Sequence, residues 1–403
     1  EEEIGSVPED SPPGGRHLRP RKRKLSPSSD TTRTSGTIED GSWKGLRNLG
    51  NTCFMNAVIQ ALNSLDYFRE FVVTLPNLEY ETTGSRNSSH NSSRRYKTRR
   101  HTKEAFTDSA VTETHTSMLA EEFRKTLIAL SPNESSTAVS PDALLQAVWG
   151  INNRFAGYSQ QDCHEFLRYT LDQLHTDLRR CRIPDNCAWR VANRCGSEYL
   201  ATSSAVSLIF EGALQSQVTC MSCQMTSNKQ DPFLDLSLDV HIPPSTNART
   251  VTTSLLECIK SFFEKEELEQ CEQYMCGSCQ DRRPSTKQLF LRNMPKALCL
   301  HLKRFRWSHA SRGKVDNMVE FPLHGLDLSQ FRSPNFKSRS QSCIYDLSSI
   351  VVHHGSGMGG GHYTAYGLRD GEWAHYNDSS VKPVDREIVL QQKAYLLFYT
   401  RVR

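Results

Sequence analysis

The sequence predicts an α+β fold in which helices come first and strands follow after about residue 205. In the first half, apolar residues recur at intervals of three and four, as on one face of a helix. The second half is rich in alternating, β-branched and aromatic segments that Gly and Pro interrupt. The 403 residues suffice for two or three domains, or one large multi-lobed one, without a disulfide framework. We therefore expect two lobes with a cleft where they meet.

Three segments show helical periodicity. Residues 118–130 and 162–178 are two of them. The third lies within residues 43–78, where Asn51 or Thr52 is the expected cap. Its apolar face is formed by Phe54, Val58, Leu62, Leu65 and Phe68. Together these segments predict a helical N-terminal lobe.

The strands are expected to form a mostly antiparallel sheet. Residues 297–305 (ALCLHLKRF) alternate strictly, and SSIVVHH, HYTAYGL, EWAHYN and AYLLFYT follow along the chain. The short connection RDGEW predicts a hairpin between HYTAYGL and EWAHYN.

Composition excludes several classes of protein. The net charge of +4 is small for the length, which argues against an obligate nucleic-acid binder. The sequence contains no run of 18 apolar residues, so it predicts no membrane-spanning helix. The 13 cysteines include two CxxC pairs, which favour metal binding or catalysis in a reducing compartment. The chain starts at Glu1 without Met, so the sequence leaves open whether further domains precede it.

Two polar segments are expected to lie outside the core. Residues 1–42 are rich in Ser, Pro, Thr and Gly, which predicts a disordered arm, and residues 79–117 predict a long surface loop. Within the arm, RPRKRKLSPSS (residues 19–29) indicates a nuclear-import signal, with a solvated charge run as the alternative. We predict a location in the nucleus, with the cytoplasm as a second compartment.

A lone thiol stands where the first helix should begin, in GLRNLGNTCFMNAVIQAL. At a helix N-terminus, Cys53 would face unpaired backbone N–H groups, which lower a thiol pKa and can hold a developing oxyanion. The alternative is a buried cysteine that acts as a small apolar residue. The choice depends on whether a base and an orienting group exist elsewhere.

Such groups occur near the C-terminus. His362 follows the glycine-rich GSGMGGG at the start of a predicted strand, and Asn377 and Asp378 end the next strand. The hairpin would bring His362 and Asn377 within hydrogen-bonding range, which completes a nucleophile, base and orienting group. His353 and His354 end an apolar strand and are weaker candidates. The glycines before His362 would let a substrate backbone approach closely.

The two CxxC pairs predict a structural zinc site. Cys220 and Cys223 form one pair, and Cys276 and Cys279 form the other. Four thiolates close a tetrahedral shell, so no position is left for catalysis. The alternative is a set of unrelated cysteines. Cys271 is a spare, and no spacing that we can interpret involves Cys181, Cys187 and Cys195.

These blocks, together with GYSQQDCHEFLRYTLDQL, LCLHLKRF, VEFPL and EWAHYNDSSV, resemble the signature motifs of the ubiquitin-specific proteases from residue 44 to the C-terminus. The resemblance implies that residues 43–403 are a papain-like catalytic domain with a helical thumb, a β palm and zinc-bearing β fingers at about residues 205–290. Such a domain grips ubiquitin while the ubiquitin tail enters the cleft between thumb and palm.

The resemblance also implies roles for individual residues. Cys53 would be the nucleophile and His362 the general base and acid, while Asn377 orients His362 with Asp378 assisting or substituting. Asn48 matches the oxyanion donor. Residues expected to contact the substrate are Gln160, Asp162, Gly360, Gly361 and Tyr363. The expected reaction is hydrolysis of an isopeptide or thioester bond at the ubiquitin C-terminus, on ubiquitinated nuclear proteins such as histones.

Three other classes are weaker. An acyl transferase shares the Cys, His, Asn/Asp order but does not explain the QQD block and the cysteine pairs together. A catalytically silent, zinc-containing ubiquitin-binding module would have lost a member of the catalytic set. A nucleic-acid binder would depend on RPRKRK and RRYKTRR, which lie in segments expected to be disordered, so we expect no sequence-specific nucleic-acid binding.

Overall fold

The computed structural model describes residues 43–78, 118–132, 137–180, 204–240, 252–268, 273–307, 312–334, 342–357 and 360–402. The predictions made for the arm at 1–42 and the insert at 79–117 lie outside these residues. The same holds for the cysteines at 181, 187, 195 and 271.

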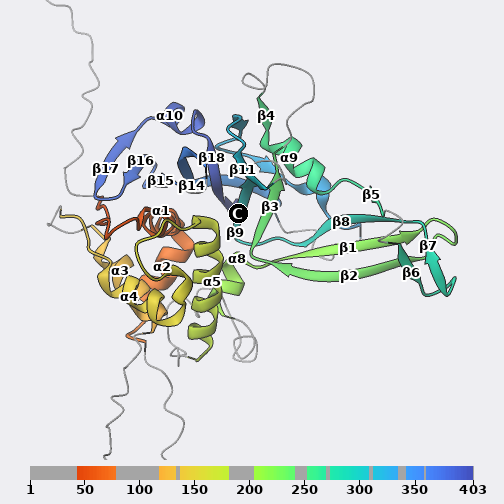
Figure 1. The fold of residues 1–403 in the computed structure, drawn as a ribbon, viewed down its shortest axis with the longest axis horizontal. Coiled ribbons are helices and arrows are strands. Elements are labelled where there is room, and N and C mark those ends of the chain that lie inside the picture. Colours follow the sequence, from red (N-terminus) through yellow and green to blue (C-terminus); the bar gives the residue numbers. More distant parts are fainter. Residues whose placement is uncertain are drawn as a thin grey trace, which may run out of the picture. The chain divides into compact units, whose positions relative to one another are not determined.

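Helices of the first half form the thumb (Figure 1). None of the helices in the described ranges is both long and apolar enough to cross a membrane. The thumb consists of α1 (Cys53–Asn63), α2 (Asp66–Thr74), α3 (Leu119–Ala129), α4 (Asp142–Ile151), the 3-10 helix η1 (Asn153–Phe155), α5 (Cys163–Arg180) and α8 (Ala205–Phe210).

The single apolar face predicted from Phe54 to Phe68 is divided between two helices. Helix α1 ends at Asn63, where the hydroxyl of Ser64 donates back to the Gln60 carbonyl at 3.0 Å. Leu65 is extended (φ −91°, ψ 99°), and its carbonyl accepts from the backbone N–H of Phe68 at the start of α2. The prediction of one helix was wrong because the spacing of apolar residues continues across the two-residue break at Ser64 and Leu65.

The palm is an eight-stranded sheet in the order β17-β16-β15-β14-β18-β9-β3, with β13 paired to β14. Neighbouring strands along this path are antiparallel except β3 and β9, which are parallel. Asp370 and Gly371, both with positive φ, form the predicted turn between β15 and β16. The strands are β3 (Asp235–Asp239), β9 (Ala297–Lys303), β13 (Leu326–Asp327), β14 (Ile344–Gly357), β15 (Gly360–Arg369), β16 (Glu372–Asn377), β17 (Ser380–Val384) and β18 (Ala394–Arg401).

Strand β9 separates two hydrophobic cores. Ala297 and Cys299 belong to the core shared with the thumb helices. Leu298, Leu300 and Leu302 belong to a second core on the other side of the sheet. The strict alternation seen in the sequence is therefore real, but both faces are covered, as expected of a strand inside a sheet that has elements on both sides.

A second sheet forms the fingers, in the order β2-β1-β8-β5. Figure 1 shows its long strands leaving the palm, with the β6–β7 hairpin at their far end. The fingers contain β1 (Gly212–Cys220), β2 (Thr226–Phe233), β5 (Glu266–Glu267), β6 (Tyr274–Cys276), β7 (Asp281–Arg283) and β8 (Ser285–Asn293).

Smaller elements surround the palm. Residues 253–254 (β4) pair with residues 319–320 (β12), and β4 leads into α9, whose N-terminus carries a capping box between Ser254 and Glu257. These elements are β4 (Thr253–Ser254), α9 (Leu255–Phe262), β10 (Phe305–Trp307), β11 (Arg312–Lys314), β12 (Val319–Glu320), η3 (Ser329–Phe331) and α10 (Arg386–Leu390).

Arg304 is a buried charge at the end of β9. Its side chain donates to the carbonyl of Ala394 in β18 at 2.7 Å, and to the carbonyls of Val315 and Asn317 at 3.0 and 2.7 Å. Arg304 is 1% exposed, so water cannot take the place of its guanidinium as the hydrogen-bond donor to these carbonyls. Arg304 thus fastens the segment after β11 to the centre of the palm.

We expect Arg304→Ala to lower the free energy of unfolding by at least about 3 kcal/mol, because it leaves buried carbonyls unpaired. Lys303→Ala is the matched control, since Lys303 forms a partly exposed ion pair with Asp239 and should cost about 1 kcal/mol or less. Urea unfolding followed by circular dichroism measures both. Equal losses for the two variants would contradict the role given to Arg304.

Candidate active site and cysteine cluster

The nucleophile candidate lies at the start of a fully buried helix. All 11 residues of α1 are buried, and Cys53 is its first residue. Thr52 occupies the cap position, but its hydroxyl makes no cap bond and accepts instead from the backbone N–H of Leu49 at 2.9 Å. The prediction of a side-chain cap from Asn51 or Thr52 was therefore wrong, and the first N–H groups of the helix, those of Cys53 and Phe54, point to the Cys53 sulfur instead.

The loop before Cys53 is fixed by a side chain from another part of the thumb. Gly50 has φ +103°, and a Cβ there would lie 2.6 Å from the ring of Tyr158, so no other residue fits. The Asn51 amide donates to the Tyr158 carbonyl at 2.7 Å. The Tyr158 side chain covers this loop but is itself 69% exposed.

The amide of Asn48 has a defined orientation. Its oxygen accepts from the backbone N–H groups of Gly50 and Thr52 at 3.0 and 3.2 Å. Its nitrogen donates to Asp378 Oδ2 at 2.9 Å. An amide nitrogen carries two protons, so one N–H of Asn48 remains for a developing oxyanion, and its role as donor stays a prediction.

Asp378 connects the end of β16 to the thumb. Besides Asn48, its carboxylate accepts from the Asn56 side chain at 2.8 Å, and its carbonyl accepts from the backbone N–H of Leu46 at 2.9 Å. The distance from its Oδ2 to His362 Nε2 is 3.9 Å. Its close partners are thus residues around the nucleophile rather than the imidazole. Sequence reasoning missed Asn56, although a buried amide within an apolar helix was a signal.

The imidazole of His362 is held by Asn377. His362 Nε2 lies 2.7 Å from Asn377 Oδ1. Because an amide oxygen only accepts, Nε2 carries the proton and Nδ1 keeps its lone pair. This is the tautomer that a general base facing a thiol requires. The paired residues of the hairpin run from Ala365 with Tyr376 to Arg369 with Glu372. His362 and Asn377 lie just beyond the first of these pairs, and their side chains meet diagonally across the two strands.

The thiol of Cys53 touches the palm strand that carries His362. Burial, at 4% exposed, raises the pKa of Cys53, and the negative charge of Asp378 adds to this rise. The backbone N–H groups of Tyr363, Phe54 and Cys53 itself act in the opposite direction but do not outweigh burial. The predicted lowering of this pKa was therefore wrong for the free protein. No hydrogen bond between Cys53 Sγ and His362 is present in the described part of the chain.

Among the predicted substrate contacts, Gln160 crosses the cleft. Its side chain donates to the carbonyl of Gly361, directly before His362, at 2.9 Å. Asp162 caps α5 by accepting from the backbone N–H groups of His164 and Glu165, and its other oxygen accepts from the Tyr395 hydroxyl at 2.6 Å.

The two palm residues that flank His362 differ in exposure. Gly360 is exposed, so its backbone remains accessible to a substrate. The Tyr363 ring is buried against His353 and Tyr395, and its backbone N–H, rather than its ring, contacts the Cys53 sulfur. The substrate contacts of all these residues stay predictions.

A polar network that sequence reasoning missed joins thumb and palm. His164 of α5 stacks on His301 of β9 with ring centroids 3.7 Å apart, and its Nε2 lies 2.9 Å from Asp235 of β3. Burial lowers the pKa of His301 to about 3, so this ring is neutral and can stack against His164 without charge repulsion. His301 also meets the hydroxyl of Ser237 at 2.9 Å.

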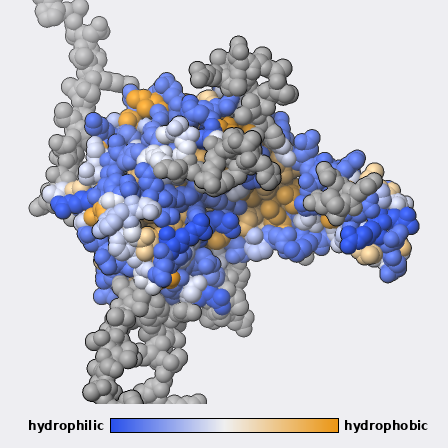
Figure 2. Space-filling model, in the orientation of Figure 1, coloured by the Kyte–Doolittle hydropathy of each residue, from blue (hydrophilic) through white to orange (hydrophobic). Residues whose placement is uncertain are grey.

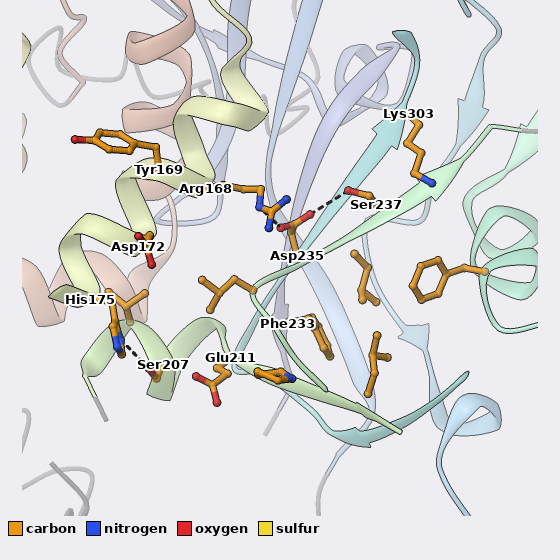
Figure 3. Close-up of a pocket in the computed structure, with 16 residues that line it drawn as sticks. Arg168, Tyr169, Asp172, His175, Ser207, Glu211, Phe233, Asp235, Ser237 and Lys303 are labelled. Atoms are coloured by element: carbon orange, nitrogen blue, oxygen red, sulfur yellow. Dashed lines mark hydrogen bonds and ion pairs between the residues drawn. The ribbon is translucent and has the colours of Figure 1, made fainter. Parts of the chain in front are cut away.

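A cavity of about 830 Å³ opens beside this network, between α5, α8 and the base of the fingers. Figure 3 shows Arg168, Asp172 and His175 on the α5 side, with Phe233 and Asp235 opposite. Figure 2 shows an apolar area where the fingers meet the body. None of the lining residues belongs to the Cys53 and His362 set, so this cavity is distinct from the residues around the thiol.

The predicted zinc ligands meet at the far end of the fingers. The Sγ atoms of Cys220, Cys223, Cys276 and Cys279 all lie within 4.8 Å of one another. Four sulfurs around a tetrahedral zinc ion are about 3.8 Å apart, so this group fits the ion. The spacing bears out the matched-pair prediction over unrelated cysteines, because residues more than 50 positions apart converge here.

The two CxxC turns have the same local geometry. Each is followed by a glutamine with positive φ, Gln224 (60°) and Gln280 (55°), whose backbone N–H donates to the carbonyl of the first cysteine of its pair. The backbone N–H of Cys223 lowers the pKa of Cys220 to about 6, and that of Cys279 lowers the pKa of Cys276. The first cysteine of each turn is thus favoured as the thiolate that a metal needs, whereas hydrogen bonding with Cys223 and burial raise the pKa of Cys279 to about 12.

Comparison with known proteins agrees with this arrangement. The family model described as ubiquitin carboxyl-terminal hydrolase matches residues 44–399. Ubiquitin carboxyl-terminal hydrolase 3 of Mus musculus is 44% identical over 400 residues, covering 94% of this chain and 73% of that protein. The Homo sapiens protein of the same name is 43% identical with the same coverage.

A solved structure shares the fold. The SAGA Ubp8/Sgf11/Sus1/Sgf73 DUB module bound to ubiquitin aldehyde matches with a TM-score of 0.67 and 29% identity, over 92% of this chain and 72% of that chain. The predicted α+β fold and the predicted family are confirmed. The chain therefore belongs to the ubiquitin carboxyl-terminal hydrolase family of thiol-dependent deubiquitinating proteases.

Proposed function

We propose that the chain hydrolyses the isopeptide or thioester bond at the ubiquitin C-terminus with Cys53 as nucleophile. The observation that carries the proposal is the 2.7 Å contact of His362 Nε2 with Asn377, which leaves the basic Nδ1 of His362 for the thiol. The backbone N–H of Tyr363 next to the Cys53 sulfur supports it, because this contact brings the thiol to the strand that carries His362.

The reaction follows from these groups. His362 takes the thiol proton, and the Cys53 sulfur attacks the carbonyl carbon at the end of the ubiquitin tail. The second N–H of Asn48 and the N–H groups at the start of α1 face the negative oxygen. His362 returns the proton to the departing lysine amine, which leaves a thioester on Cys53. His362 then takes a proton from water as the water oxygen attacks the thioester. The C–S bond breaks, His362 returns that proton to the Cys53 sulfur, and the carboxylic acid of the released ubiquitin loses its own proton to solvent.

Ubiquitin itself is proposed to dock on the surface that extends from the cleft to the fingers. The cavity beside α5 offers apolar residues and both charge signs, a combination that suits a protein partner. A known relative structure contains ubiquitin aldehyde, which supports ubiquitin as the partner. Chemically, the exposed glycine backbone at Gly360 suits a substrate that ends in two glycines.

For the conjugated protein, we propose ubiquitinated nuclear proteins such as histones. The support is the basic run at residues 19–24 beside Ser-Pro sites, which has the composition of a nuclear-import signal. The competing reading, a catalytically silent ubiquitin-binding module, would predict a missing catalytic group, whereas Cys53, His362 and Asn377 are all present.

Ubiquitin with an electrophilic C-terminal group should form one covalent adduct with this chain, seen by intact mass spectrometry. Cys53→Ser should form none, because the hydroxyl is a far weaker nucleophile. Binding of ubiquitin without an adduct on the wild type would favour the silent module. Absence of both adduct and binding would favour an acyl transferase with another substrate.

Burial raises the pKa of the Cys53 thiol above its ordinary value of 9.0. The rate at which iodoacetamide alkylates Cys53 should therefore rise with pH and reach no plateau below pH 9.0. The sign follows because a raised pKa leaves a smaller thiolate fraction at neutral pH than in a free cysteine. Peptide mass spectrometry separates Cys53 from the exposed Cys223. A plateau near pH 7 would show that the thiolate is already formed in the free protein.

We further propose that the four-cysteine cluster holds one structural zinc ion, which would link the two CxxC turns at the end of the fingers. Cys276→Ser should lower the zinc content from about one per chain and reduce the melting temperature, because the closed site loses a ligand. Cys343→Ser, a buried cysteine outside the cluster, is the control that keeps the metal. Native protein without zinc in elemental analysis would overturn the proposal.

A further inference from the structure

A buried lysine contacts the bend that leads to His362. Lys314, at the end of β11, donates from Nζ to the carbonyls of His353 and Gly355, each at 2.8 Å. Its side chain is 4% exposed, and Asp316 lies 3.7 Å from the ammonium. A lysine ammonium has three N–H donors, and the two carbonyls take two of them, while the Asp316 carboxylate balances the charge from beyond hydrogen-bonding distance.

Burying an ammonium group costs free energy unless it is fully hydrogen-bonded. The carbonyls that stabilise the Lys314 ammonium belong to β14, the strand that pairs with the strand of His362. In this pairing His353 lies opposite Tyr363, and His354 lies opposite His362. Beyond His354 the register of β14 and β15 shifts, so ordinary strand pairing restrains the bend less. Lys314 supplies the missing restraint at that point.

The same hairpin contacts His353 a second time. Phe305 pairs with Lys314 across β10 and β11, and its ring meets the His353 ring edge-on with centroids 5.2 Å apart. On its other side, the His353 ring lies so close to Gly361 that a Cβ there would be 2.4 Å from Nε2. The neutral His353 ring therefore lies between the β10–β11 hairpin and Gly361, the residue immediately before His362.

We propose that Lys314 is a positioning residue for His362. By holding the His353 and Gly355 carbonyls, it sets the path of β14 on both sides of His354, and through the pairing of His354 with His362 the approach of the imidazole to Cys53. This inference rests on the proposed role of His362 as general base. It concerns the geometry of the base and not the binding of ubiquitin.

The test is turnover of ubiquitin carrying a fluorogenic C-terminal amide by the full chain. Lys314→Met should lower kcat on the order of 10²-fold, because a base displaced by about 1 Å loses a factor of that size. KM should stay within about two-fold, because ubiquitin contacts are retained. Lys314→Arg keeps donors for the two carbonyls and should recover most of kcat. Lys393→Met is the matched control, since Lys393 also pairs with Asp316 but does not touch the bend.

The outcomes separate the inference from the function on which it depends. Rates are normalised to the folded fraction, and Lys314→Leu, which also has no donor, replaces Lys314→Met if the latter does not fold. An unchanged kcat, a loss that appears only in KM, or an equal loss in Lys393→Met would overturn the role of Lys314. Inactive wild type, or His362→Ala as active as wild type, would instead refute the proposed function.

Discussion

The carboxylate of Asp378 holds the two lobes of the site together. It accepts from Asn48 in the loop before the nucleophile and from Asn56 within α1, although these residues lie more than 300 positions away in the sequence. Its left-handed backbone (φ 48°) directs the carbonyl to Leu46 as well. One residue at the end of β16 thus fixes the loop and the helix that present the thiol, while its neighbour Asn377 fixes the imidazole.

The consequence is a site with one rigid side and one adjustable side. Helix α1 is buried around its whole circumference, so Cys53 has little freedom to move. His362 instead follows a glycine-rich bend, held by Gln160 from the thumb and by Lys314 from the β10–β11 hairpin. Alignment of base and nucleophile is therefore decided on the palm side. The high pKa of the buried thiol fits this division, because deprotonation needs the base to arrive.

Much of this could be predicted from the sequence because the signals are local. The turn at Asp370 and Gly371 placed His362 near Asn377, and the CxxC spacing placed four sulfurs in two matched turns. Alternation in β9 predicted a strand, but not that each face belongs to a different core. Periodicity likewise could not register the break at Ser64, because the next helix begins in phase with the last.

The remaining features depend on tertiary packing. The pKa of Cys53 is set by how deeply the thiol is buried, which no spacing in the sequence reports. The stack of His164 on His301, and the carbonyls held by Arg304 and Lys314, join segments whose separation gives no pattern. Polar residues inside otherwise apolar motifs, such as Asn56 and Arg304, were the signal for such contacts, since a buried polar group needs a partner.

The Tyr158 ring offers a practical consequence. It packs over Gly50 and beside Trp149, yet most of its surface faces solvent. A fluorescent label attached at position 158 would lie next to the nucleophile loop without entering either core. Such a label would convert occupancy of the cleft into an optical signal, and the rigid helix behind the loop would keep its background constant.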